Sequence, residues 1–81
     1  MMTITVKYFG AVADSTQKKE EVFRFESERI TLNLVQSRLE EQYPNLKNIT
    51  YSFAVNQSIT KEDVGLNDND EIALLPPFAG G

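Results

Sequence analysis

The 81-residue sequence contains no cysteine, no histidine and no tryptophan. Without cysteine there is no disulfide, no thiolate nucleophile and no iron–sulfur ligand, and without histidine there is no Ser–His–Asp relay or Cys/His zinc site. If this protein takes part in difficult chemistry, most of the reactive groups must come from a partner.

Basic residues are also scarce, with 8 Lys and Arg against 12 Asp and Glu, and the formal net charge is −4. An acidic surface repels phosphate backbones, so we expect no direct contact with nucleic acid. No stretch approaches the roughly 18 apolar residues of a membrane span, and the first residues lack the basic head and apolar run of a signal peptide. We therefore expect a cytoplasmic protein that does not contact membranes.

The residues that are present suffice for one small domain, since 41% are hydrophobic, including five Phe and three Tyr. Apolar and polar residues alternate over residues 3–9, 21–26, 51–55 and 71–75, which predicts four strands. Residues 56–57 have the composition of a tight turn into a short fifth strand around residues 58–59.

One segment has a convincing helical pattern. Thr31 can cap the first turn, and the apolar residues that follow at steps of three and four are Leu32, Val35, Leu39 and Tyr43. Pro44 disfavours helix at the preceding residue and ends the segment nearby. Residues 11–19 are polar and turn-like, with room for one short helical turn.

This order of elements predicts an α+β fold over residues 1–75, in which one main helix packs on one face of a mixed sheet of four to five strands. Periodicity leaves open whether the first and last strands pair in parallel at the centre. The expected core residues are Ile4, Val6, Phe23, Phe25, Leu32, Val35 and Leu39. Four other residues fall on the face away from the helix as a candidate docking surface, unless the strand register is wrong and they are core: Phe9, Ala54, Ala73 and Leu75.

The last six residues form a predicted flexible tail: Pro76, Pro77, Phe78, Ala79, Gly80 and Gly81. Two prolines end sheet pairing, and the extended tail reaches at most about 20 Å. Gly80 and Gly81 fit a slot too narrow for other residues, while Phe78 can anchor in a partner. The α-carboxylate of Gly81 is then the obvious group for activation by ATP. Two terminal glycines also arise by chance in roughly 0.5% of chains, so an incidental Gly-Gly remains the alternative.

The residues 54–57, Ala-Val-Asn-Gln, and the whole segment 66–81 resemble the MoaD/ThiS family of ubiquitin-like β-grasp sulfur carriers. The Pro-Pro, apolar, small, Gly-Gly ending resembles the molybdopterin synthase branch of that family. Two departures are visible. Asn69 stands where the family usually has glycine, and Ala79 stands where serine or threonine is common.

The resemblance implies a mechanism and a set of partners. An adenylyltransferase similar to the ubiquitin-activating class uses ATP and magnesium to adenylate Gly81, and a persulfide donor converts it to a thiocarboxylate. The tail, with Pro76 to Gly80 leading Gly81, then enters the large subunit of molybdopterin synthase. There the sulfur passes to cyclic pyranopterin monophosphate, and the dithiolene of molybdopterin forms. The chain itself holds no permanent cofactor, the catalytic side chains belong to the large subunit, and the assembly is a heterotetramer.

Three alternatives stay open. A protein modifier joined through Gly81 to lysine would use the same activated carboxylate, as would a sulfur carrier for thiamin or tRNA thiolation. An adaptor whose Gly-Gly is incidental would use neither. The acidic residues Asp68, Asp70 and Glu71 lack the spacing of a calcium loop, so we expect a solvated turn there and no metal site.

Overall fold

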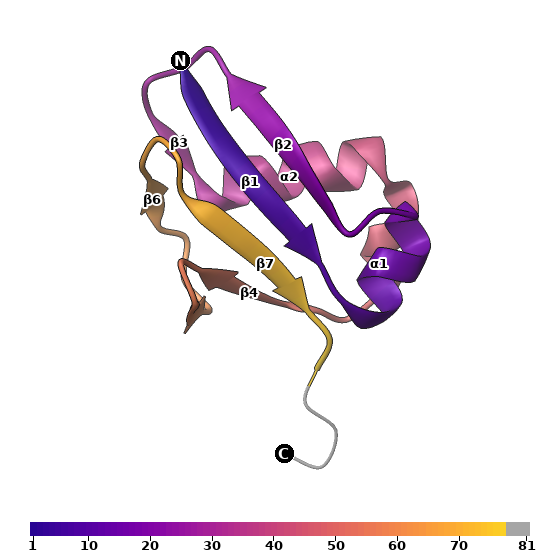
Figure 1. The fold of residues 1–81 in the computed structure, drawn as a ribbon. Coiled ribbons are helices and arrows are strands. Elements are labelled where there is room, and N and C mark those ends of the chain that lie inside the picture. The colour runs from indigo at the N-terminus through magenta and orange to yellow at the C-terminus, as the bar shows by residue number, and fades with distance from the viewer. Residues whose placement is uncertain (78–81) are drawn as a thin grey trace.

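The computed structural model describes residues 1–77, and its centre is a five-stranded mixed sheet in the order β2-β1-β7-β4-β5 (Figure 1). The strands are β1 (Met2–Tyr8), β2 (Glu20–Phe25), β4 (Ser52–Val55), β5 (Ser58–Thr60) and β7 (Glu71–Leu75). β1 and β7 are parallel neighbours, and every other pair in this sheet is antiparallel. The predicted α+β architecture is confirmed, and the two strands whose pairing the pattern left open lie side by side.

The alternation of β1 and β7 assigns each residue to one face of the sheet. Ile4, Val6 and Tyr8 point into the core, and the parallel register sets Val6 beside Ile72. The intervening residues face the other way, as the period of two requires.

Helix α2 (Leu32–Gln42) crosses the inner face of the sheet, and both of its ends form as the sequence predicts. The Thr31 hydroxyl accepts a hydrogen bond from the Leu34 amide at 3.4 Å, which satisfies one free donor of the first turn. At the other end the Tyr43 amide donates to the Leu39 carbonyl at 2.7 Å. Pro44 then begins a short 3-10 helix, Pro44–Asn48, because a proline ring is tolerated in a first turn.

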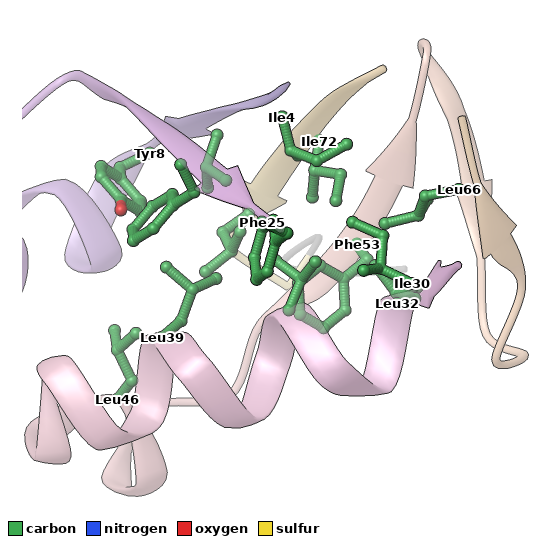
Figure 2. Close-up of a cluster of buried hydrophobic side chains, with 14 of the residues drawn as sticks. Ile4, Tyr8, Phe25, Ile30, Leu32, Leu39, Leu46, Phe53, Leu66 and Ile72 are labelled. Atoms are coloured by element: carbon green, nitrogen blue, oxygen red, sulfur yellow. The ribbon is translucent and has the colours of Figure 1, made fainter. Parts of the chain in front are cut away.

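The core lies between α2 and the sheet, where side chains from both layers meet in Figure 2. Every residue predicted to be core is buried there. Eight further members complete this cluster, and they are Tyr8, Val12, Ile30, Leu46, Phe53, Leu66, Ile72 and Leu74. Burial of this apolar surface is the main force that holds the domain together.

Residues 10–16 are the clearest departure from expectation, because they form helix α1 (Gly10–Thr16) rather than a mostly irregular turn. Only Val12 and Thr16 of this helix are buried. A seven-residue helix with two inward positions gives almost no periodic signal, so tertiary contact decides its conformation. A second small sheet, β3 (Ile30–Thr31) paired with β6 (Gly65–Leu66), was also not expected.

The turn before β7 contains a left-handed residue, and one of its acidic residues is more buried than expected. Asn69 has a φ of 69°, the left-handed conformation that asparagine tolerates. Asp70, expected in a solvated turn, is only 9% exposed. Its carboxylate accepts hydrogen bonds from the Asn56 side chain at 2.9 Å and the Asn67 amide at 2.8 Å, so it joins this turn to the β4–β5 turn.

Two further expectations concern membrane-spanning helices and the boundary between the domain and the tail. No helix within residues 1–77 is long and apolar enough to cross a membrane. The division between a domain of residues 1–75 and a tail of residues 76–81 stays a prediction, because residues 78–81 lie outside the described part of the chain.

Candidate functional site

The outer face of the five-stranded sheet, on the side away from α2, carries the four residues predicted as a docking surface. The strand register brings Ala54 opposite Ala73, and Phe9 follows directly on β1 beside the end of β7. The Phe9 amide donates to the Leu74 carbonyl at 3.2 Å, which extends the pairing of these two strands by one residue. Phe9, Ala54, Ala73 and Leu75 therefore share one area of the sheet.

A hollow of about 410 Å³ lies over this area and is lined by all four predicted residues. Four residues that were not predicted to belong to the docking surface complete the lining, and they are Lys7, Gln57, Ile59 and Glu71. Phe9 is 44% exposed and Ile59 is 52% exposed, which is high for large apolar side chains. Ile59 was missed because a three-residue strand shows too little alternation to assign its faces.

Ala54 differs from the other three because it is only 5% exposed. Its small side chain lies between Ala73 on β7 and Ile59 on β5, in the floor of the hollow. Two alanines on adjacent strands leave the depression that larger residues at these positions would fill.

One ion pair crosses the rim of the hollow. The Lys7 ammonium lies 3.4 Å from the Glu71 carboxylate, and both side chains are more than a third exposed. A pair this exposed contributes little to stability, at most about 1 kcal/mol. It does give the apolar floor a polar border with both signs of charge.

A second hollow, of about 390 Å³, shares Phe9 and Lys7 with the first. Its lining combines the end of β1, the start of α1 and the start of β2, and consists of Lys7, Tyr8, Phe9, Gly10, Ala13, Lys19 and Glu20. The Phe9 side chain therefore borders both hollows, close to the end of β7.

Beneath this second hollow, the Glu21 carboxylate accepts four hydrogen bonds. The donors are the hydroxyls of Tyr8 at 2.9 Å and Tyr43 at 2.7 Å, the Lys18 ammonium at 3.1 Å and the Gln42 amide at 3.1 Å. Burial opposes ionisation, but these donors outweigh it and lower the pKa of Glu21 below its ordinary value. Burial and the bond to Glu21 raise the pKa of Tyr8. The network fixes Tyr8, and with it the end of β1 that carries Phe9.

The predicted reactive segment begins at the edge of these hollows. Pro76 and Pro77 follow β7 and are exposed, whereas Phe78, Ala79, Gly80 and Gly81 lie outside the described residues. Within residues 1–77 no three acidic side chains gather as metal ligands. The described part of the candidate site is therefore an apolar surface with two hollows, next to the start of the tail.

Comparisons with known proteins identify the family of this chain. The sequence profile of the ThiS family matches residues 6–81. A protein of Mycobacterium tuberculosis named molybdopterin synthase sulfur carrier subunit is 36% identical to this chain, and the match covers 100% of both.

Solved structures agree on the fold. A Pyrococcus furiosus protein assigned to subunit 1 of a molybdopterin converting factor superposes with a TM-score of 0.86 at 18% identity, covering 96% of this chain and 100% of that one. Small archaeal modifier protein 1 of Methanosarcina acetivorans gives a TM-score of 0.80 at 23% identity, covering 100% and 98%. The Helicobacter pylori complex of subunits 1 and 2 of a molybdopterin-converting factor contains a chain with a TM-score of 0.71 at 23% identity, covering 99% and 100%. These structures show that the fold is the ubiquitin-like β-grasp fold. The profile match over residues 6–81 and the full-length match at 36% identity show that the chain belongs to the ThiS family.

Proposed function

We propose that this protein is the sulfur carrier subunit of a molybdopterin synthase. The observation that carries the proposal is the full-length match, at 36% identity, to a protein of that name. The Pro-Pro-Phe-Ala-Gly-Gly ending, residues 76–81, supports it because two terminal glycines give a backbone thin enough to enter a narrow active site.

In this proposal the carboxylate of Gly81 is the reactive group. An adenylyltransferase joins it to AMP with release of pyrophosphate, using ATP and magnesium. A persulfide donor then displaces AMP, and reductive release by a thiol leaves sulfur on Gly81 as a thiocarboxylate. The thiocarboxylate delivers that sulfur to cyclic pyranopterin monophosphate, with the catalytic side chains supplied by the large subunit.

In this proposal the outer sheet face docks onto the partner, and the tail delivers the sulfur. Its apolar hollow lies where β7 ends, so a partner that covers Ala73 and Leu75 is already next to the start of the tail. Burial of apolar area on docking supplies the association energy, and the ion pair of Lys7 and Glu71 at the rim favours one orientation. We propose Phe9, Ala54, Ala73 and Leu75 as contacts to the large subunit, with Phe78 as an anchor beyond them.

The state of the C-terminus provides the direct test. After incubation with the adenylyltransferase, ATP, magnesium and a persulfide donor, intact mass should increase by the exchange of one oxygen for one sulfur. Fragmentation should place that change on Gly81. The variant that lacks Gly81 should gain no sulfur and form no molybdopterin, and molybdopterin formation by this variant would refute the proposal.

Docking can be tested separately from sulfur loading. Ala73→Glu introduces a carboxylate into the apolar hollow, so binding to the large subunit should weaken by at least tenfold in calorimetry. Ser37→Glu, on the exposed face of α2, is the matched control and should bind like the unmodified protein. Equal binding by both variants would exclude the outer face as the contact.

A protein modifier remains the second candidate, favoured by the fold shared with small archaeal modifier protein 1. It predicts isopeptide bonds between Gly81 and lysines of other proteins, which tryptic peptides from cell lysate would reveal. Adducts without any thiocarboxylate product would favour the modifier over the carrier.

A further inference from the structure

The corner between β1 and α1 lies against the first residue after β7 (Figure 1). Phe9 ends the pairing with β7, because its backbone N–H donates the last hydrogen bond, to the Leu74 carbonyl. Gly10 then turns the chain into α1 with a φ of 56°, in the left-handed region where residues with a side chain are strained. This turn exposes the bare Cα of Gly10 toward the exit of β7.

The ring of Pro76 occupies the space next to that Cα. A Cβ atom built on Gly10 would lie 3.2 Å from Pro76 Cγ and 3.3 Å from Pro76 Cβ, closer than ordinary van der Waals contact. Pro76 is rigid in φ and cannot swing aside without moving the peptide that follows. A side chain at position 10 would therefore shift the start of the tail.

We infer that Gly10 is a positioning residue: it forms a seat for Pro76 and thereby sets the direction in which the tail leaves the sheet. This inference rests on the proposed function, because a direction matters only if the tail must enter a partner. Gly10 and Phe9 are consecutive and both line the second hollow, so the seat is tied to the proposed docking surface. A partner that holds Phe9 then meets a tail that starts in a defined place.

The consequence for transfer follows from distance. A reacting group displaced by about 1 Å can lose a factor of 100 in rate, even when binding is unchanged. Gly10→Asn adds a Cβ toward Pro76 while keeping a residue that accepts a left-handed backbone. We expect this variant to bind the large subunit with an unchanged Kd and to transfer sulfur at least tenfold more slowly in a single turnover.

Gly65 provides the matched control, because a Cβ added there meets nothing within 4 Å. Gly65→Asn should transfer sulfur at the rate of the unmodified protein. Pro76→Ala removes the ring from the other side of the contact and should also slow transfer. If the two residues act through one contact, the double variant Gly10→Asn with Pro76→Ala should be no slower than the slower single variant.

Two readouts separate this inference from the proposed function. An NMR nuclear Overhauser effect between the Gly10 α protons and the Pro76 ring, in the full chain, tests the seat without any enzyme. If this signal is present but the unmodified protein delivers no sulfur, the proposed function fails while the contact between Gly10 and Pro76 stands. Normal single-turnover rates in both Gly10→Asn and Pro76→Ala, or absence of the Gly10–Pro76 signal, would overturn the positioning role.

Discussion

Glu21 shows how one side chain can hold several elements together. Its carboxylate accepts hydrogen bonds from Tyr8 of β1, from Gln42 at the end of α2, and from Tyr43 and Lys18. The Glu21 side chain is only 18% exposed. Hydrogen bonds to a charged acceptor are stronger than those between neutral groups, and this carboxylate has four donors. The network secures the end of β1 next to Phe9 and Gly10.

The pH dependence of this contribution has a definite sign. Because the pKa of Glu21 is lower in the folded state than the ordinary 4.5, its stabilisation is complete above that value and is lost as pH falls through the folded pKa. Glu21→Gln should therefore lower the free energy of unfolding by about 1 kcal/mol at pH 7. Urea titrations should show this difference shrinking as the pH falls below 4.5.

The exposed neighbour Glu20 supplies the control for that measurement. Glu20→Gln removes the same charge without a buried network, so its unfolding free energy should change by less than about 0.5 kcal/mol. A constant difference between Glu21→Gln and the unmodified protein from pH 7 to pH 3 would contradict the assignment.

Two tyrosines give a matching prediction at high pH. Burial raises the pKa of Tyr51 to about 12, with its hydroxyl donating to Glu40 at 2.8 Å, and burial with the Glu21 bond raises that of Tyr8. A raised folded pKa means that the stabilisation is complete below the ordinary value of 10.0 and is lost as pH rises above it. Unfolding free energy should therefore fall between pH 10 and pH 12.

Ultraviolet absorbance at alkaline pH measures the ionisation of the tyrosines directly. Tyrosinate formation by Tyr51 should be centred near pH 12 in a Tyr8→Phe variant. If all tyrosines of the folded protein ionised together near pH 10.0, the buried hydroxyl bonds would be disproved.

At the scale of elements, the β4–β5 hairpin combines a tight turn with a strained residue. Asn56 and Gln57 have φ of 49° and 73°, so both turn residues are left-handed, as a two-residue hairpin of the mirror-image type requires. Glycine is the usual residue at the second position. Gln57 accepts the strain there, at the border of the larger hollow.

Replacing Gln57 by glycine should relieve that strain. We expect Gln57→Gly to raise the free energy of unfolding by about 0.5 to 1 kcal/mol, measured by urea titration. Ser58→Gly, one residue later in extended β5, should lower it instead, because glycine there adds only disorder to the unfolded chain. A loss of stability in Gln57→Gly would show that the glutamine side chain makes a contact worth more than the strain.

The elements also show where sequence reasoning succeeds. The cap at Thr31, the stripe from Leu32 and the stop at Pro44 make α2 predictable, since each feature acts locally. Helix α1 has no side-chain cap and only two buried residues, so its stability comes from contacts that no local pattern encodes. Asp70 was misjudged for a similar reason, because its partner Asn56 is fourteen residues away.

At the scale of the whole molecule, the sequence predicted the α+β class, the covered face and the core, but not the order of strands in the sheet. Periodicity assigns faces, whereas strand order depends on pairings between distant residues such as Val6 with Ile72. The candidate docking residues could be named because Phe9, Ala73 and Leu75 have outward positions in their own strands. The hollow itself could not be predicted, because Ile59 and Gln57, which line it, come from the neighbouring β4–β5 hairpin.

The arrangement also predicts how truncation affects stability. Buried apolar residues of the described chain run from Ile4 to Leu74, so removal of residues 78–81 should change the unfolding free energy by less than about 0.5 kcal/mol. Removal of residues 71–81 takes away β7, which pairs with both β1 and β4, and should abolish cooperative unfolding in circular dichroism. A folded protein without residues 71–81 would contradict the central position of β7.

The parallel pairing of β1 with β7 has a mechanical consequence. The register runs from Thr5 beside Glu71 to Tyr8 beside Leu74. A pull applied to Met2 and Leu75 in opposite directions slides these two strands along each other and loads their hydrogen bonds together in shear. Bonds that are loaded together share the force, so β1 and β7 should separate at a higher force than strands whose bonds open one at a time.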